Sequence, residues 1–580
     1  MIRLLSTLLA TLLALSCSDS QNGTLVLTLS DGAGGEPTPA RVEISNAEGV
    51  SVVPLDALPI FEDCGSLPLH NWVPWAASVQ HLRGRHGEIS NPYTGTTQFY
   101  SRGVTSVGLL PGRYTLAATK GIEYDVAATE VVIESGRTSE VELVLERWID
   151  LPASGWYGAD DHLHIPRPHS RFDSAIATWM QAEDIHVANL LQMGLAQDVH
   201  ITPQHSFGQV AVYREGNTLL ASGQENPRTH VLGHSIILGT RQWIDFPSDY
   251  VLYDRFWRLA HEQGAINGYA HWGLAGAEEG LAVWGHEGLL DFIEVLNLGF
   301  PFYQRWYEAL DLGLRLGPTA GSDYPCLPSL PGRERFYTRL EGDLDYRAWL
   351  DAVRRGRTFV TNGPVVEFEV SGVGIGEEVR LSAPGRVHVE GRVRFDRERD
   401  DVEKLELIRA GEVVQAVSSA TGEDEIRLES TLEIDRSTWL ALRASGRKVG
   451  ESLVEPKELL GSLFTLPRPS NDEVLAELPE GTVARLSAAH TGAVWVTVAG
   501  SPPIAEQPRA REVVELWLER LDELENRLRD ERLDEMAHFP GRGDGISRRD
   551  LLDSRAALLR AIVATRRQIV RPVADTAPSP

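Results

Sequence analysis

Two imidazoles separated by a single residue, those of His162 and His164, directly follow the acidic pair Asp160 and Asp161. Side chains alternate between the two faces of an extended segment, so both imidazoles project to one side and can bind one ion together. A turn that carries two surface histidines is the alternative, and it would be the better interpretation for an isolated pair. Ligand types further along the chain therefore decide between the two.

Residues of ligand type recur at the expected ends of later strands. His271 ends a strand expected over residues 265–270, Glu294 lies late in the next strand, and Asp323 follows the strand after that. Side chains at the carboxyl ends of parallel strands converge on one mouth, so we expect these residues to meet. Scattered surface histidines would not keep this phase.

A hairpin is expected between the two groups. Gly223-Gln224-Glu225 precedes a polar turn, and Gly233-His234 opens an apolar run. This places a carboxylate and an imidazole at the ends of the hairpin. A carboxylate can bridge two cations, and neutral imidazoles suit Zn, Mn or Fe.

The segments that must position these residues alternate between strand and helix. Helices are expected over 250–263, 302–316 and 346–354, and short apolar strands over 265–270 and 289–296. Such alternation predicts parallel strands in a distorted β/α barrel.

The rest of the chain has β-strand texture until two amphipathic helices close it, so the fold class is multidomain α/β plus β. The expected domains are a signal peptide over 1–17, a β-sandwich over 22–147, the metal-binding domain over 148–363, a β-sandwich with an insertion over 364–503 and a helical hairpin over 505–573.

Composition and the N-terminus restrict partners and location. The chain has 580 residues and a net charge of −27, with no basic block carrying interleaved aromatics, so no nucleic-acid partner is expected. Residues 1–17 contain Arg3, an apolar run and then Cys17, which resembles a bacterial lipobox. We expect an exported cell-envelope protein held to the membrane by a lipid on Cys17. A periplasmic or secreted soluble protein is the alternative.

The other cysteines are Cys64 and Cys326. Two thiols in an exported protein could pair, but the sequence does not show whether their Cβ atoms meet. Neither belongs to a Cys-x-x-Cys unit, so a thiolate zinc site is not expected.

The ligand-type residues belong to an ordered series of short motifs. Together these resemble the PHP (polymerase and histidinol phosphatase) superfamily of metal-dependent hydrolases. A later stretch, residues 356–364, resembles the closing segment of its CehA/McbA-type members, and the match spans roughly residues 110 to 365. The motifs are Asp160-Asp161-His162-Leu163-His164, Gly223-Gln224-Glu225, Gly233-His234, Tyr269-Ala270-His271-Trp272, Glu294-Val295-Leu296-Asn297 and Gly321-Ser322-Asp323.

The resemblance implies a PHP-like hydrolase domain with one or two divalent ions, zinc in preference to manganese or iron. It implies that Glu225 is the bridging ligand and that Glu225 and Asp323 are catalytic. Two departures from the family pattern stand out. Residues 189–194 offer only amides where a Thr-Asp-His unit is usual, and Asp323 is followed by Tyr324 and Pro325 where the family commonly ends in Asp-x-His. The implied metal ligands are His162, His164, Glu225, His234, His271 and Asp323.

Such a site supports hydrolysis, because a divalent ion lowers the pKa of water and polarises a carbonyl or phosphoryl oxygen. Asp323 could accept the proton of the water, and His234 or His271 could donate to the leaving group. The substrate would be a small molecule or conjugate with an ester, amide, carbamate or phosphoester bond. The sequence does not select among these bonds, nor does it give the oligomeric state.

Two other classes of protein compete with the hydrolase. One is a non-catalytic surface binding or adhesion lipoprotein on a degenerate hydrolase scaffold, supported by the missing Thr-Asp-His unit. The other is a structural envelope lipoprotein with neither metal nor turnover. The sequence also leaves open the roles of Glu294, His200 and His205, and whether Arg333, Arg335 and Tyr337 clamp an anion or form an exposed ion-pairing loop.

Overall fold

The computed structural model describes residues 22–58, 87–91, 95–194, 200–229, 232–271, 277–297, 299–325, 329–420, 422–449, 486–529 and 548–570. The chain forms two compact units. The first comprises residues 1–62, 71–150 and 178–184, and the second comprises 63–70, 151–177 and 185–580. The expected signal peptide with Cys17, together with Cys64 and Cys326, lies outside the described residues. Lipidation therefore stays a prediction, and pairing of the two thiols stays open.

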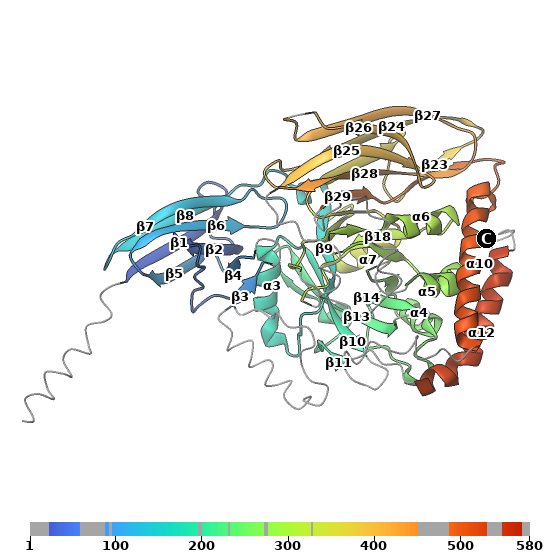
Figure 1. The fold of residues 1–580 in the computed structure, drawn as a ribbon, viewed down its shortest axis with the longest axis horizontal. Helices are drawn as coiled ribbons and strands as arrows, with labels where there is room; N and C mark the ends of the chain where they lie inside the picture. The colour runs from blue at the N-terminus through green and yellow to red at the C-terminus, as the bar shows by residue number, and fades with distance from the viewer. Residues whose placement is uncertain are drawn as a thin grey trace, which may run out of the picture. The chain divides into compact units, whose positions relative to one another are not determined.

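The first unit consists of two antiparallel-rich sheets that share an apolar core (Figure 1). Alternation in the sequence explains this arrangement, since Leu25, Leu27 and Leu29 of one strand are all buried in that core. One sheet has the order β5-β1-β8, formed by Val104–Leu109, Gly23–Asp31 and Thr138–Leu145. The other has the order β3-β4-β2-β6-β7, formed by Glu88–Ser90, Thr97–Ser101, Ala40–Asn46, Gly112–Thr119 and Ala127–Ile133.

The second unit places the predicted site on one large mixed sheet. The site strands in chain order are β9 (Trp156–Leu163), β10 (Val187–Gly194), β13 (Thr218–Thr229), β14 (Gly233–Leu238), β15 (Ile266–Tyr269), β16 (Phe292–Asn297) and β18 (Gly317–Ala320). Strands β9, β10 and β13 run parallel to one another, as do β15, β16 and β18. Strand β14 pairs antiparallel with both β13 and β15, which confirms the expected hairpin between Glu225 and His234.

The predicted fold class, a distorted β/α barrel flanked by β-sandwich domains, is wrong. Among the described residues 44% lie in strands and 23% in helices. The strand order of the large sheet closes on itself, but the sheet includes antiparallel pairs. It also continues from β19 (Arg335–Arg339) and β20 (Thr358–Thr361) into strands that were expected to form the second sandwich. The cause is the direction of pairing: hairpins interrupt the parallel run, so strand and helix do not alternate around a ring.

The strands beyond β20 form the rest of this sheet and a further four-stranded sheet of order β22-β21-β24-β27. The edges and turns of the large sheet carry β11 (His200–Ile201), β12 (Tyr213–Glu215) and β17 (Phe300–Pro301). The later strands are β21 (Val365–Val370), β22 (Val373–Gly374), β23 (Glu378–Leu381), β24 (Gly385–Arg394), β25 (Asp400–Arg409), β26 (Glu412–Ser418), β27 (Glu425–Ile434), β28 (Thr438–Lys448), β29 (Leu486–Thr491) and β30 (Val494–Val498).

Asn362, in the closing segment, joins the site strands to the later ones. Its side-chain amide donates to the carbonyl of Leu486 at 2.8 Å and accepts from the backbone N–H of Ala488 at 2.9 Å. The buried Lys448 donates to the backbone carbonyl of Asn362 and pairs with Asp400. The polar groups at this junction are therefore satisfied, as buried groups must be.

The expected helices over 250–263, 302–316, 346–354 and near the C-terminus are present. They are α4 (Tyr253–Glu262), α6 (Tyr303–Asp311), α7 (Tyr346–Arg354), α10 (Pro508–Arg529) and α12 (Arg548–Val570), accompanied by α3 (Asp173–Ala182) and α5 (Ala277–Trp284). Helix α7 shows how local sequence sets such limits: Asp345 caps its start by accepting from the N–H of Ala348, and Gly356 follows its end with φ of +68°.

The C-terminal helices α10 and α12 lie side by side, and α10 also contacts α5 and α6 (Figure 1). Trp517, Leu521 and Leu524 of α10 join the same apolar core as the helices around the site strands. No helix in the described part of the chain is long and apolar enough to cross a membrane.

Candidate metal centre

His162 and His164 meet as the alternation of β9 predicts. Their Nε2 atoms lie 3.1 Å apart, and both side chains are completely or almost completely buried. The Nδ1 atom of His162 lies 2.9 Å from Oε2 of Glu294. That contact leaves Nε2 as the nitrogen of His162 that can bind an ion.

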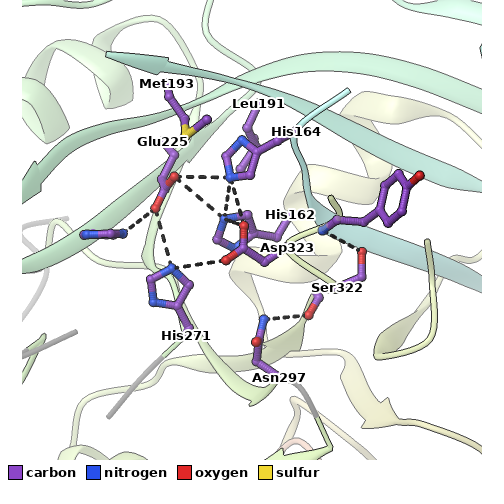
Figure 2. Close-up of polar contacts among 12 residues, drawn as sticks. His162, His164, Leu191, Met193, Glu225, His271, Asn297, Ser322 and Asp323 are labelled. Carbon is purple, nitrogen blue, oxygen red and sulfur yellow. Dashed lines mark hydrogen bonds and ion pairs between the residues drawn. The ribbon is translucent and has the colours of Figure 1, made fainter. Parts of the chain in front are cut away.

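Glu225 and Asp323 bring carboxylates to these imidazoles (Figure 2). Oε2 of Glu225 lies 3.3 Å from Nε2 of His164, and Oδ1 of Asp323 lies 3.1 Å from the same nitrogen. The other oxygens face His271: Oε1 of Glu225 and Oδ2 of Asp323 lie 3.6 and 3.8 Å from its Nε2. Each carboxylate therefore spans the space between the His162–His164 pair and His271.

The backbone holds His271 and Asp323 in unusual conformations. Their φ angles are +27° and +51°, in the region that favours glycine. Strained residues of this kind cluster at functional sites, because the surrounding structure must hold them there. Gly321 permits the approach, since a Cβ at this position would lie 2.4 Å from Cβ of His162.

His234 lies beside the cluster formed by His162, His164, Glu225, His271 and Asp323 rather than within it. Its Nδ1 is 2.6 Å from Oε1 of Glu225, and its ring meets that of His271 edge to face with centroids 4.9 Å apart. Its buried Nε2 has no hydrogen-bond partner among the residues that the structure describes. Nδ1 of His234 therefore faces Glu225, and Nε2 is the nitrogen left for a ligand role.

Glu294 orients two members of the cluster from β16. One of its oxygens accepts from the backbone N–H of His271 at 2.9 Å and also contacts His162. Its other oxygen accepts from Asn297 at 2.6 Å, and Asn297 also donates to the carbonyl of Gly321. A carboxylate behind a ligating histidine fixes the tautomer and ring orientation, and Glu294 has this position. Its role was open from the sequence.

The carboxylates reverse the effect of burial on two imidazoles. Burial alone would lower the pKa of His162, but Asp323 and Glu294 outweigh it and raise that pKa well above its ordinary value. The pKa of His164 is also raised, because hydrogen bonding to Asp323 outweighs burial. His234 differs: burial lowers its pKa to about 3. The cluster thus attracts positive charge to its His162–His164 side.

The carboxylates themselves stay ionised. Burial alone would raise the pKa of Glu225, but Arg228 and His234 outweigh it and hold that pKa well below its ordinary value. Likewise the pKa of Asp323 is lowered, because His162 and its neighbours outweigh burial. Ionised carboxylates beside imidazoles are the donors that a divalent cation needs.

Asp160 fastens the Asp323 loop to β9. Its carboxylate accepts from the hydroxyl of Ser322 at 2.6 Å and from the backbone N–H groups of His162 and Gly332 at 3.0 and 2.8 Å. Burial raises the pKa of Asp160 to about 6. Asp160 therefore positions two ligand-bearing segments without reaching the cluster itself.

Several neighbours of the cluster were not predicted. Leu191 and Met193 of β10 stand beside His164 and Glu225, at the position of the missing Thr-Asp-His unit (Figure 2). Met193 pairs in parallel register with Glu225, which is why both side chains share a face. Predicting these neighbours would have required the register of β10 against β13, which the sequence alone does not give.

The other sequence candidates lie elsewhere. His205 pairs with Asp173 at 3.4 Å and contacts Ser206, and Arg335 is buried and donates to the carbonyl of Gly332 at 2.6 Å. Tyr337 stacks on Phe359. The side chain of His200 is outside the described part of the structure.

The buried His, Asp and Glu groups could hold a metal ion. His162, His164 and Asp323 form one close group of ligand atoms, and His162, Glu225 and His271 form another. The chemistry of this donor set fits a divalent transition metal, because imidazole nitrogens and carboxylate oxygens are its usual protein ligands. The unpartnered Nε2 of His234 fits the same interpretation.

No protein-family model matches the sequence, and no curated protein matches it. The minor pilin GBS52 of Streptococcus agalactiae is 15% identical over 22% of this chain and 46% of its own, with a TM-score of 0.14. A streptococcal ancillary pilin is 15% identical over 25% and 38%, with a TM-score of 0.15. The Bacillus anthracis TIE protein is 9% identical over 83% and 50%, with a TM-score of 0.13. The matches thus span half or less of each of those chains, and such TM-scores support no argument about function.

Proposed function

We propose that this chain is a metal-dependent hydrolase that cleaves an ester, amide, carbamate or phosphoester bond in a small molecule or conjugate. The observation that carries the proposal is the arrangement of Glu225 and Asp323, each of which turns one oxygen to the His162–His164 pair and the other to His271. Buried titratable groups whose pKa values are shifted by one another cluster at functional sites. The ordered motifs that resemble the CehA/McbA-type metallohydrolases support the same class.

The ligand groups define where ions would be held. His162, His164 and Asp323 form one group that would hold an ion, and His162, Glu225 and His271 form the other, with His234 beside Glu225. Zinc is the preferred ion, with manganese and iron as alternatives, since all three accept imidazole and carboxylate donors.

The side chains have separate tasks in hydrolysis. A divalent ion at this position supplies Lewis acidity, which lowers the pKa of water and polarises the oxygen of the scissile group. Asp323 lies where its carboxylate can accept a proton from an attacking water, and Glu225 fixes the imidazoles around it. His234 contacts Glu225, and with a pKa lowered to about 3 it stays neutral, which suits a ligand rather than a proton donor.

A non-catalytic binding protein is the second candidate. Leu191 and Met193 occupy the place where the resembling enzymes carry further ligands, and β10 offers no His, Asp or Glu there (Figure 2). A protein that binds a metal but has lost turnover would keep the other ligands. For either candidate we propose export and a lipid on Cys17, from the composition of residues 1–17.

Elemental analysis of the purified full chain tests the proposal first. The wild type should contain one or two equivalents of zinc, manganese or iron, and a His162→Ala/His164→Ala variant should contain almost none. Matched His388→Ala, on an exposed strand pair away from the cluster, should keep the metal. Metal-loaded protein is then assayed on ester, amide, carbamate and phosphoester panels. Absence of bound metal after incubation with each ion would exclude the hydrolase, whereas bound metal without turnover would favour the binding protein.

A further inference from the structure

A bulge in β13 turns Arg228 toward the metal centre. In a regular strand Glu225 and Arg228, three positions apart, would face opposite sides of the sheet. The register shifts between them: Glu225 pairs with Ile236 and Arg228 pairs with His234, so β13 has one residue more than β14 over this stretch. Such bulges re-aim side chains, often next to active sites. As a result, Nη1 of Arg228 lies 3.3 Å from Oε2 of Glu225.

The guanidinium of Arg228 stands at the edge of the centre. Its side chain is 11% exposed, against 1% for that of Glu225. The oxygen that it contacts, Oε2 of Glu225, is the one that also faces His164 at 3.3 Å. Arg228 is therefore next to the ion-binding atoms and is more open to solvent than the carboxylate that it contacts.

Pairing with Glu225 accounts for this placement only while no cation is bound. A divalent ion and a guanidinium both draw on the negative charge of Glu225, so Arg228 weakens the hold of Glu225 on an ion. Once an ion is bound, the charge of Glu225 is offset without Arg228. A guanidinium also presents a planar fork of N–H donors, which matches the oxygens of carboxylates and phosphoryl groups. What the site gains from Arg228 is attraction for an anion.

We propose that Arg228 binds an anionic group of the substrate, a carboxylate or a phosphoryl group, beside the metal centre. This inference rests on the proposed hydrolase function and narrows its substrate class to anionic molecules. Arg335, which the sequence offered for this task, donates to the backbone carbonyl of Gly332 instead. The substrate would be oriented by two contacts, its anionic group at Arg228 and its scissile group at the ions.

The test measures anion binding directly, without turnover. Inorganic phosphate and acetate are titrated separately into the metal-loaded full chain by calorimetry at constant ionic strength. The variants are Arg228→Met and Arg228→Lys, with Arg354→Met as the matched control, because its guanidinium pairs with Asp291 at 3.1 Å outside the centre. Metal content is measured for every sample.

Arg228→Met should weaken binding of at least one probe by about 10- to 100-fold, since a charge-assisted contact is lost. Arg228→Lys should give an intermediate loss, because it keeps the charge without the fork. Arg354→Met should bind as the wild type does. The probe with the larger loss identifies the anionic group as carboxylate or phosphoryl.

Unchanged affinity for both probes in Arg228→Met, at unchanged metal content, would overturn the inference. So would loss of metal from both Arg228→Met and Arg228→Lys, because that result makes Arg228 a structural partner of Glu225. If only Arg228→Met loses metal, the anion affinity of Arg228→Lys decides instead. Unchanged affinity of that variant for both probes would also overturn the inference. Failure of the hydrolase proposal is a separate result, seen as missing turnover while the Arg228-dependent anion binding persists.

Discussion

Two buried histidine sites in the second unit have opposite electrostatics. His162, in the metal centre, and His490, on β29, are both completely buried. Nε2 of His490 accepts from the hydroxyl of Tyr307 at 2.6 Å, and its Nδ1 donates to the carbonyl of Thr491 at 2.8 Å. The rings of Tyr303, Trp306 and Tyr307 surround it with centroids 4.5, 5.1 and 5.5 Å away.

The difference shows what burial does alone and what carboxylates add. Among aromatic rings, burial lowers the pKa of His490 to about 3. Among carboxylates, Asp323 and Glu294 outweigh the same burial and raise the pKa of His162. Both nitrogens of His490 are satisfied by protein atoms, so its site is complete without a ligand. The metal centre gathers negative charge and donor atoms that a cation would satisfy.

Metal removal should give the largest separation between the two sites. At free metal about 1,000-fold above the dissociation constant, binding to the folded state adds about 4 kcal/mol to the free energy of unfolding. Denaturant unfolding of metal-loaded and chelator-treated protein measures this loss. Variants at His490 should show the same metal-dependent difference as the wild type. An unchanged midpoint after verified metal removal would contradict the prediction.

His490→Phe should destabilise the protein by about 1–3 kcal/mol, because the buried hydroxyl of Tyr307 loses its acceptor. Metal content should not change. A double variant with Tyr307→Phe should recover part of the loss, since removing both partners leaves no unsatisfied group. Equilibrium unfolding of both single variants and the double variant measures these free energies. If the two single losses simply add in the double variant, His490 and Tyr307 are not coupled.

Glu294→Gln should weaken metal binding by about 10- to 100-fold, because the carboxylate behind His162 is lost. Glu406→Gln is the matched comparison: Glu406 is a mostly buried carboxylate that pairs with Arg443, which contributes to the surroundings of His490. Competition with a chromogenic chelator measures the affinities. Equal metal affinities for Glu294→Gln and Glu406→Gln would show that Glu294 does not contribute to metal binding.

The smallest predicted effect is the pH dependence of His490. Its folded pKa of about 3 is below the ordinary 6.5, so between these values the unfolded chain binds a proton that the folded chain does not. Stability is therefore full above pH 6.5 and is lost as the pH falls. Between pH 7 and 6 the loss should be under about 1 kcal/mol, and His490→Phe should lack it. Unfolding of the metal-loaded wild type and of His490→Phe at each pH measures this loss. If His490 is charged in the folded state, the two proteins should show the same pH dependence.

The sequence predicted which residues of the candidate metal centre would meet better than it predicted the fold around them. Alternation placed His162 and His164 on one face, and strand ends placed His271 and Asp323 nearby, because both are local properties of the chain. Arg228 escaped prediction because its face depends on a register shift against β14. Which strands pair, and in which direction, is not a local property, so correct helices and strands still led to the wrong fold class.

The site around His490 was not predicted at all. Its parts come from α6 and β29, separated by more than a hundred residues of chain, and aromatic residues carry no spacing that marks such a meeting. Glu294 was recognised as a ligand type, but its place behind His162 and His271 requires the packing of β16 between other strands. Residues that hold ligands in place are harder to predict than the ligands themselves. Their role depends on which residues they contact in the fold, and residue type alone does not reveal it.

The candidate ligands are His162 on β9, His164 just beyond it, Glu225 on β13, and His271 and Asp323 just beyond β15 and β18. No single part of the chain therefore holds the complete set before these strands assemble. We therefore expect an ion to bind only once these strands have assembled. Because related divalent ions compete for such donors, availability decides among them. The compartment in which the chain folds, together with its donor set, should then decide which ion the site takes.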